Sequence, residues 1–388
     1  MDSELNFLDS KASVIYGIDA LSANKENRTG VENYSRSLIQ SLKNHPLQKD
    51  ERVVLYSLSS LDEELNKLPQ GWSAKILSWF LKRGWMSIRM SWEMIFHAPT
   101  VLFVPGQALP IFCPRRVLTT IHDVAFARRP DLYDPVVRKR LTRVTKQAVK
   151  KATRILVPSQ ATKDDLVELY NVDPDRVTVV HLAADTTLYH PYTSQEAASV
   201  LQKYRLGTNF FLVVGRLEKK KNITTLIRAF ELFKSRRGVG DPFELVFAGE
   251  PGYGYEKMKA YFDLSPVKSH IRQLGYVPDE DLAPLMSQAT AYLFPSWYEG
   301  FGIPSLEAMA SGTPVLASSI AVHKEVIGDV GILIPPGESE AWAQAMGEIV
   351  HNAALRTDLI TKGKERAKNF SWEKTAQQTW EVLRNLVY

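Results

Sequence analysis

The chain contains little of what marks secreted or membrane-spanning proteins. One cysteine, Cys113, occurs among its 388 residues, so no internal disulfide can form. No apolar run reaches the roughly 18 residues of a membrane-spanning helix. Residues 1–19 begin acidic and lack the basic start and apolar stretch of a signal peptide. We therefore expect a cytoplasmic protein in which Cys113 is a small apolar packing residue.

Metal-binding and nucleic-acid-binding motifs are also scarce. No Asp-x-Asp pair or histidine cluster is suited to holding Mg²⁺ or Mn²⁺, so we expect no metal site. The formal net charge is +5, and the basic residues are scattered along the chain. A mildly basic surface of this kind suits phosphate-bearing ligands or anionic lipid, and we expect no nucleic-acid partner.

Short apolar runs recur along the whole sequence. In the first half they predict strands at 14–18, 52–57, 100–104, 116–121, 153–157 and 177–181. In the second half they predict strands at 210–215, 243–249, 271–276, 290–296, 313–318 and 331–334. Continuous runs are typical of strands covered on both faces. Helical periodicity fills the gaps, as at 31–43 and 222–234, which indicates two parallel sheets in an α/β fold.

The length of the chain favours two domains of similar size. A polar, proline-bearing segment within 185–208 separates the two sets of strands. We expect an N-terminal Rossmann-like domain at 1–190 and a C-terminal one at 191–370. A last helix, at 371–388, begins with Ser371 as its N-cap.

Segment 71–97 has an unusual composition. Its four tryptophans are interleaved with Lys75, Lys82, Arg83 and Arg89. One interpretation is a pair of helices that pack in the core. The other is an amphipathic surface that touches a lipid interface or an apolar acceptor. The sequence leaves both interpretations open.

The first motif with chemical content is GRLEKKKN at 215–222. It follows an apolar strand and opens a helix, and ligands of open α/β sheets bind beyond the carboxyl ends of the strands. Arg216 and Lys221 could converge there on a diphosphate, the first as a planar fork and the second as a point charge. The alternative is that both side chains are simply solvated.

The second motif is SWYEGFGIPSLEAMASGTPVLAS at 296–318. Glu299 lies at the end of a strand, and Glu307 follows eight residues later, near the start of a helix. Gly300 and Gly302 allow backbone N–H groups to approach a ligand closely. Carboxylates at such a site can accept hydrogen bonds from sugar hydroxyls. Alternatively, Glu307 interacts with the helix dipole and Glu299 is a solvated loop charge.

Together these motifs resemble the donor half of the retaining glycosyltransferases of family 4 (group 1), which have the GT-B fold. The resemblance continues in TGVENYSRSLI at 29–39, in TIHDVAFARRPDLY at 120–133 and through 157–185, so it covers nearly the whole chain. It implies two Rossmann-like doubly wound domains that face each other across a cleft, with the C-terminal helix crossing back onto the N-terminal domain. LEKKKN and TIHDVAF resemble the mannosyltransferase-like branch.

The resemblance also implies roles for individual residues. Arg216 and Lys221 would bind the donor's diphosphate, Glu299 would contact the transferred sugar, and His122 would lie near that sugar. Asp123 follows on the strand and points to the other face, so a His–Asp dyad is not expected. Glu307 would hold the ribose hydroxyls. The remaining donor-binding positions would be Gly30, Gly215, Gly249, Phe301, Gly302 and Ile303, although a surface turn is as good an interpretation of the segment that begins at Gly249.

The reaction that the resemblance implies is the retaining, metal-independent transfer of a sugar. The expected donor is GDP-mannose, and the expected acceptor is a glycan or a lipid-linked saccharide in surface-polysaccharide assembly. The nucleotide sugar is then a co-substrate, and no cofactor is expected. A lipid-linked acceptor would bring segment 71–97 to the inner face of the cell membrane.

Two alternatives keep the fold and change the activity. A nucleotide-sugar epimerase should lack the combination of Arg216 and Lys221 with two glutamates in E-x7-E spacing. A non-catalytic nucleotide-binding protein would not need Lys221, Glu299 and Glu307, and all three are present.

Overall fold

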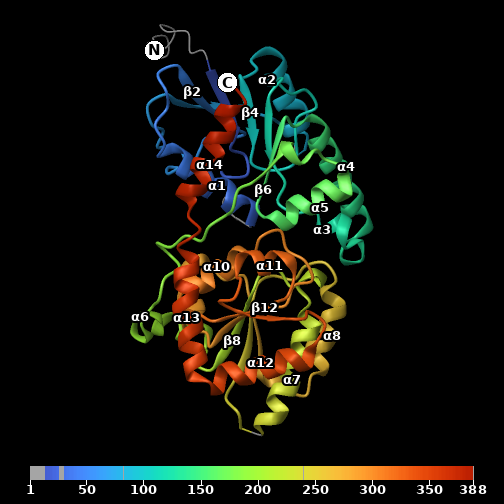
Figure 1. Ribbon diagram of the computed structural model, residues 1–388, viewed down its shortest axis with the longest axis vertical. Helices are drawn as coiled ribbons and strands as arrows, with labels where there is room; N and C mark the ends of the chain where they lie inside the picture. Colours follow the sequence, from blue (N-terminus) through green and yellow to red (C-terminus); the bar gives the residue numbers. More distant parts are fainter. Residues whose placement is uncertain (1–13, 26–29, 82, 239, 388) are drawn as a thin grey trace.

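The computed structural model describes residues 14–25, 30–81, 83–238 and 240–387. The acidic stretch 1–13, Lys82 and the first residue of the 29–39 motif therefore lie outside the described residues. The chain folds into two α/β halves, one above the other in Figure 1, and each half is built on a parallel sheet. The prediction of a two-domain, doubly wound α/β protein is confirmed, while the exact boundaries at residues 190 and 370 stay predictions.

The N-terminal half contains a seven-stranded sheet in the order β3-β2-β1-β4-β5-β6-β7. Six of these strands coincide with predicted runs, and only the edge strand β3 was not predicted. The strands are β1 (Val14–Asp19), β2 (Glu51–Ser57), β3 (Trp72–Ile76), β4 (Val101–Val104), β5 (Val117–Thr120), β6 (Arg154–Val157) and β7 (Val177–Val179).

The C-terminal half contains a six-stranded sheet in the order β10-β9-β8-β11-β12-β13, and all six strands coincide with predicted runs. All residues of β11 and β12 are buried, and in β8 only Val214 is partly exposed, as expected from their continuous apolar sequences. The strands are β8 (Phe210–Val214), β9 (Glu244–Ala248), β10 (Ile271–Gly275), β11 (Ala291–Phe294), β12 (Val315–Ser318) and β13 (Ile332–Ile334).

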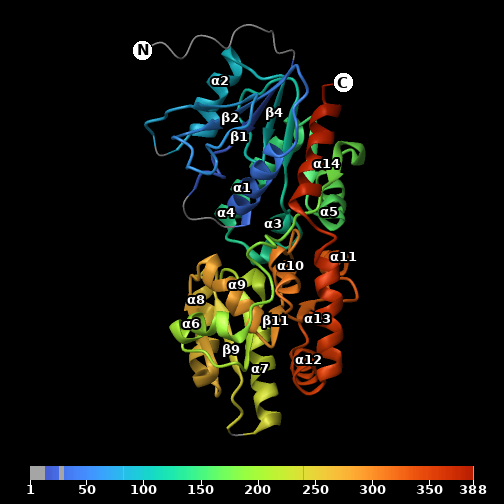
Figure 2. The ribbon, with the colours of Figure 1, turned by 90° about the vertical axis from the view of Figure 1, so that its left-hand side faces the viewer.

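Helices cover both faces of each sheet (Figures 1 and 2). Those of the first half are α1 (Gly30–Lys43), α2 (Met90–Phe96), α3 (Ala125–Arg128), α4 (Pro135–Lys151) and α5 (Gln160–Tyr170). Those of the second half are α6 (Ser194–Tyr204), α7 (Ile223–Arg237), α8 (Tyr255–Leu264), α9 (Asp279–Gln288), α10 (Ile303–Ala310), α11 (Ala321–Val326), α12 (Ser339–His351) and α13 (Ala353–Ala367). The short helical turns are η1 (Trp85–Arg89), η2 (Pro130–Leu132), η3 (Pro174–Arg176), η4 (Lys219–Lys221) and η5 (Lys268–His270).

The last helix, α14 (Trp372–Asn385), returns from the second half to the first and lies beside α1 (Figure 2). Trp380 Nε1 donates to the Leu42 carbonyl at 3.1 Å. Arg384 donates to both carboxylate oxygens of the buried Glu51, at 3.0 and 2.9 Å. Burial would raise the pKa of Glu51, but this guanidinium pair outweighs it and the pKa is lowered. The ionised carboxylate of Glu51, paired with Arg384, therefore fixes α14 to the start of β2.

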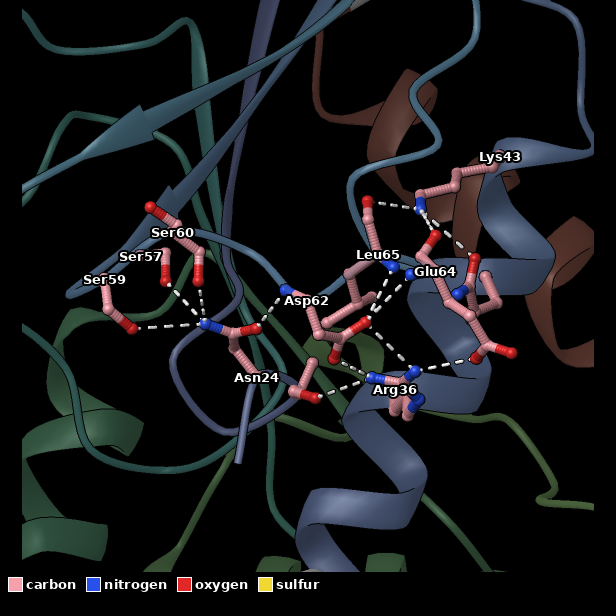
Figure 3. A network of polar contacts seen from close by, with 11 residues as sticks. Asn24, Arg36, Lys43, Ser57, Ser59, Ser60, Asp62, Glu64 and Leu65 are labelled. Atoms are coloured by element: carbon pink, nitrogen blue, oxygen red, sulfur yellow. Dashed lines mark hydrogen bonds and ion pairs between the residues drawn. The ribbon is translucent and has the colours of Figure 1, made fainter. Parts of the chain in front are cut away.

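A polar network fixes the loop that follows β1 (Figure 3). Arg36 on α1 forms ion pairs with Asp62 and Glu64, which lie in the loop after β2. Asn24, in the loop after β1, accepts from the Asp62 backbone N–H at 2.9 Å and donates to the Ser60 carbonyl at 2.9 Å. The two loops are therefore held to each other and to α1 at the carboxyl ends of their strands.

The structure corrects the interpretation of segment 71–97 as a pair of helices. Its first residues form strand β3, which pairs with β2, and only its second part is helical, in η1 and α2. Trp72 and Trp85 are core residues, 8% and 5% exposed, and Trp79 is half-buried. Only Trp92 is largely exposed, at 62%. Packing against the core thus accounts for three of the four tryptophans, because Trp79 packs against the buried cluster that contains Trp85.

Candidate functional site

The two sequence motifs meet at one place in the C-terminal half. The strand order reverses between β8 and β11, and such a switch point is where open α/β sheets bind ligands. Residues 215–222 leave the carboxyl end of β8, and residues 295–302 leave that of β11. The Trp297 N–H donates to the Lys220 carbonyl at 3.0 Å, and Asn222 Nδ2 donates to the Pro295 carbonyl at 3.1 Å. The sheet topology therefore brings distant parts of the sequence into one site.

Lys221 and Glu299 are in direct contact at this site. Lys221 Nζ lies 2.9 Å from Glu299 Oε1 and 4.8 Å from the centroid of the Phe294 ring. The lysine side chain passes over Gly215, where an added Cβ would lie 3.3 Å from Lys221 Cε. Gly215 also has a φ of +117°, which disfavours any side chain. The glycine therefore gives Lys221 room to lie flat against the loop.

Lys220 adds a second cation and connects the two halves. Its Nζ lies 3.6 Å from Glu299 Oε2 and 3.8 Å from Oδ2 of Asp123, which belongs to the N-terminal half. Burial would lower the pKa of Lys220, but the charges of Glu299 and Asp123 raise it. Lys220 is therefore a charged, nearly buried bridge between the donor motif and the N-terminal half.

The two glutamates of the second motif differ in charge. Burial would raise the pKa of Glu299, but Lys220 and Lys221 lower it to about 2, so it is a carboxylate at neutral pH. Burial, followed by the charges of Asp279 and Asp185, raises the pKa of Glu307 to about 8. Glu307 therefore carries a proton at neutral pH, and such divergent pKa values are typical of functional sites.

Arg216 does not join the Lys221–Glu299 contact. It is exposed, and its Nη2 donates to the Pro251 carbonyl at 3.3 Å. Gly249 lies against the same loop, since an added Cβ would meet the Gly215 carbonyl oxygen at 2.1 Å. The Gly249 N–H already donates to the Gly275 carbonyl at 2.7 Å, so Gly249 is a packing residue in this structure. The roles of both residues in donor binding stay predictions.

The N-terminus of α10 opens beside Glu299. Gly302 is its N-cap, with a φ of +98°, and in the described structure no side chain caps this end. Ile303 begins the helix, so the predicted N–H donors of 301–303 lie at the positive end of the α10 dipole. The Phe301 side chain is buried against His181 and Phe370. Only the backbone of Phe301 is therefore available to a ligand.

His122 faces the donor motif from the N-terminal half. A Cβ added to Gly300 would lie 2.0 Å from the His122 carbonyl oxygen, so the two backbones touch. The Gly300 carbonyl accepts from Ser159 Oγ at 2.7 Å and from Thr162 Oγ1 at 3.2 Å. His122 Nε2 donates to the Pro105 carbonyl at 3.2 Å, and burial lowers the pKa of the imidazole. The imidazole is thus neutral at physiological pH.

Gly30 is exposed at the first position of α1, and an added Cβ would meet nothing within 4 Å. Residues 26–29, which precede it, lie outside the described part of the chain. Tyr34 from the same motif does reach the site, because its hydroxyl lies 2.9 Å from Thr120 Oγ1 and its ring lies 4.6 Å from the His122 ring. The predicted role of Gly30 stays a prediction.

The sequence motifs do not distinguish Lys220 from its neighbours, do not single out Ser159, and indicate no contact of Asp123 with the second half of the protein. Three consecutive lysines, 219–221, look alike in the sequence, but their side chains diverge. Lys219 donates to the Asp131 carbonyl at 2.6 Å, and its two neighbours reach Glu299. Periodicity cannot separate them because η4 is a single helical turn, which only Asn222 separates from α7.

Comparisons with known proteins agree with this geometry. The family model of group 1 glycosyl transferases matches residues 196–366, and that of glycosyltransferase family 4 matches residues 28–188. The chain is 31% identical over 300 residues to O-antigen chain mannosyltransferase B of Escherichia coli, covering 77% of this chain and 76% of that protein. It is 29% identical over 308 residues to O-antigen chain mannosyltransferase RfbU of Salmonella typhimurium, covering 79% of each.

Solved structures share the fold at low sequence identity. Sucrose-phosphate synthase from Thermosynechococcus elongatus superposes with a TM-score of 0.74 at 18% identity, over 96% of this chain and 99% of that chain. HepE of Anabaena in complex with UDP-glucose gives a TM-score of 0.74 at 16% identity, over 96% and 100%. WaaG, a glycosyltransferase involved in lipopolysaccharide biosynthesis, gives 0.71 at 16% identity, over 95% and 99%. The chain therefore belongs to the group 1, family 4 glycosyltransferases and is a glycosyltransferase with the GT-B fold.

Proposed function

We propose that the protein transfers mannose from GDP-mannose to a glycan or lipid-linked acceptor in surface-polysaccharide assembly, with retention of configuration and without a metal ion. Two relatives that match most of the chain, in Escherichia coli and Salmonella typhimurium, are named O-antigen chain mannosyltransferases. Because HepE was solved with UDP-glucose, UDP-glucose is the appropriate competing donor.

The observation that best supports this reaction is the contact between Lys221 and Glu299 at the switch point of the sheet. Transfer breaks the bond between the anomeric carbon and the phosphate oxygen, and the departing diphosphate gains negative charge. Lys221, with Arg216 on the same loop, would stabilise that charge in place of a metal ion. The acceptor hydroxyl forms the new bond on the same face of the sugar, and its proton passes to the departing phosphate oxygen.

The remaining residues would hold the donor. Glu299, a carboxylate, would accept hydrogen bonds from hydroxyls of the transferred sugar. Glu307 would bind the ribose hydroxyls, and the N-terminus of α10 would face the phosphates. The neutral His122 would contact the sugar from the N-terminal half. A lipid-linked acceptor would bring the enzyme to the inner face of the cell membrane.

The test is a donor assay on the full chain in EDTA. GDP-mannose and UDP-glucose are offered with the same saccharide acceptors, and release of the nucleoside diphosphate is followed together with the anomeric configuration of the product. We expect GDP release and an α-linked product, nearly abolished in Lys221→Ala and unchanged in the matched control Lys257→Ala, since Lys257 is exposed on α8. UDP release alone would overturn the choice of donor. An inverted product, or turnover that requires a divalent metal, would overturn the mechanism.

A further inference from the structure

The N-terminal half has an exposed apolar surface that the donor site does not use. Its members are Ile88, Trp92, Ile95, Phe96, Ile111 and Phe112, and each is more than half exposed. The first four lie on η1 and α2, and the last two lie in the loop before β5. The rings of Trp92 and Phe96 are in contact, with centroids 5.0 Å apart and planes tilted by 47°. Large apolar side chains gathered in this way mark a surface that contacts something other than water.

Hydrogen bonds join the backbone of the 110–112 loop to both α2 and the basic helix α4. Ser91 Oγ on α2 accepts from the Ile111 N–H at 2.8 Å and from the Phe112 N–H at 3.2 Å. Lys151, the last residue of α4, donates to the Pro110 carbonyl at 2.8 Å and to the Ile111 carbonyl at 2.7 Å. In Figure 1 α2 lies at the top of the N-terminal half and α4 at its right-hand edge. We call the six apolar side chains and the basic side chains of α4 the α2–α4 face.

Helix α4 carries positive charge and no negative charge. Its 17 residues contain no Asp or Glu. Lys139, Arg143, Lys146 and Lys150 follow a helical repeat on one side, are exposed, and form no ion pair with any described residue. The acidic residue of α2, Glu93, is 2% exposed and is paired with Lys75 and Arg89. Neither α2 nor α4 therefore exposes a carboxylate that would compensate these cations.

We propose that the α2–α4 face docks on an anionic lipid bilayer, with the side chains of α2 and the 110–112 loop inserted among the headgroups and α4 held against the lipid phosphates. Aromatic and aliphatic side chains flanked by Lys and Arg are typical of surfaces that lie in a bilayer interface. A nucleic acid would use the cations and leave the apolar side chains in water. No helix of the described chain is long and apolar enough to cross a bilayer. This docking rests on the proposed function only for its purpose, namely to bring the enzyme to a lipid-linked acceptor.

The test is sedimentation of the full chain with phosphatidylcholine vesicles, with and without phosphatidylglycerol. We expect binding only to the anionic vesicles, weakened by salt. Changing Lys139, Arg143, Lys146 and Lys150 to Gln should raise the lipid concentration for half-binding about tenfold or more. Trp92→Ser, Phe96→Ser and Phe112→Ser together should weaken binding to a similar extent.

A matched control removes the same charge from the other half of the molecule, by changing the exposed Lys257, Lys259, Lys268 and Lys364 to Gln. This control should bind vesicles like the wild type. Unfolding midpoints close to that of the wild type establish that all three variants are folded. An equal loss of binding in the control, no binding to anionic vesicles, or heparin binding that accounts for all of the anion affinity would overturn the proposal. Vesicle binding by a protein without donor turnover would leave docking intact and overturn the proposed function.

Discussion

Lys220 lies between two carboxylates from different halves of the protein, 3.8 Å from Asp123 and 3.6 Å from Glu299. The first carboxylate follows β5 in the N-terminal half, and the second belongs to the donor motif. Asp123 is itself held in place because its Oδ1 accepts from the Ala125 N–H at 3.0 Å. The position of the N-terminal half is thereby linked electrostatically to the carboxylate that would contact the sugar.

This link predicts that Lys220 and Asp123 act as a pair. Lys220→Met and Asp123→Asn should each lower kcat/KM, and the double variant should be no worse than the more severe single variant. We expect a coupling of about 1 kcal/mol in a double-mutant cycle of kcat/KM, because both changes remove the same interaction. Lys220→Arg should restore part of the activity. Strictly additive effects would contradict the pairing.

Removal of Lys221 should affect the reaction far more than the fold. Lys221→Ala leaves Glu299 with Lys220 as its remaining cation and takes positive charge from the departing diphosphate. We expect kcat to fall about a hundredfold or more, as for loss of one charge-stabilising donor, while the unfolding midpoint changes little. Steady-state kinetics and a thermal melt measure the two effects. A kcat close to that of the wild type would remove Lys221 from the chemistry.

The raised pKa of Glu307 predicts that nucleotide binding releases a proton. Burial and the charges of Asp279 and Asp185 raise the pKa of this carboxyl from its ordinary value of 4.5 to about 8, so the protein holds this proton at pH 7. Ribose hydroxyls that donate to the carboxylate would lower that pKa. Binding should therefore release close to one proton at pH 7 and almost none at pH 9. Calorimetry in buffers with different ionisation enthalpies measures the release, and Glu307→Gln should abolish it.

The same pKa shift has a consequence for stability. The unfolded chain loses this proton near pH 4.5, while the folded chain keeps it up to about pH 8. Between these values the unfolded state binds fewer protons, so the contribution of Glu307 to stability falls as pH rises. Glu307→Gln lacks this loss. The unfolding midpoint of Glu307→Gln, measured relative to that of the wild type, should therefore rise from pH 5 to pH 8. A difference in midpoint that does not change with pH would contradict the raised pKa of Glu307.

The substitution Gly300→Ala tests the backbone contact between Gly300 and His122, which joins the two halves. A Cβ at this position would lie 2.0 Å from the His122 carbonyl oxygen, so Gly300→Ala forces the two backbones apart. We expect kcat/KM to fall about a hundredfold, because misplacement by about 1 Å is costly for catalysis. The matched control is Gly347→Ala on α12, where an added Cβ meets nothing within 4 Å. That control should keep full activity, and an equally active Gly300→Ala would show that this contact is not needed.

The fold was predictable from the sequence because most of its strands are buried on both faces. Continuous apolar runs identify such strands directly, and twelve of the thirteen strands coincide with them. Edge strand β3 has a different pattern, since Trp72 is buried and the four residues after it are exposed. That pattern is too short to distinguish a strand from a helix, and neither of the two interpretations of segment 71–97 included a strand.

The candidate site was predictable in part. Lys221 and Glu299 lie where the motifs indicated, because strand order carries both loops to one switch point. The side-chain partners were not predictable. The ion pair between Lys220 and Asp123 joins residues from different halves of the protein. The raised pKa of Glu307 depends first on burial and then on the charges of Asp279 and Asp185, which no local pattern connects to it.

The most direct test of the donor site is a thermal-shift measurement with GDP, UDP, dTDP and ADP, in EDTA, on the wild type and on Lys221→Ala. A ligand at about 100 times its dissociation constant stabilises a protein by roughly 2.7 kcal/mol, which raises the unfolding midpoint by several degrees. We predict a clear shift with GDP in the wild type and its loss in Lys221→Ala. No shift without a divalent metal, or an equal shift in Lys221→Ala, would contradict a metal-free diphosphate site built on Lys221.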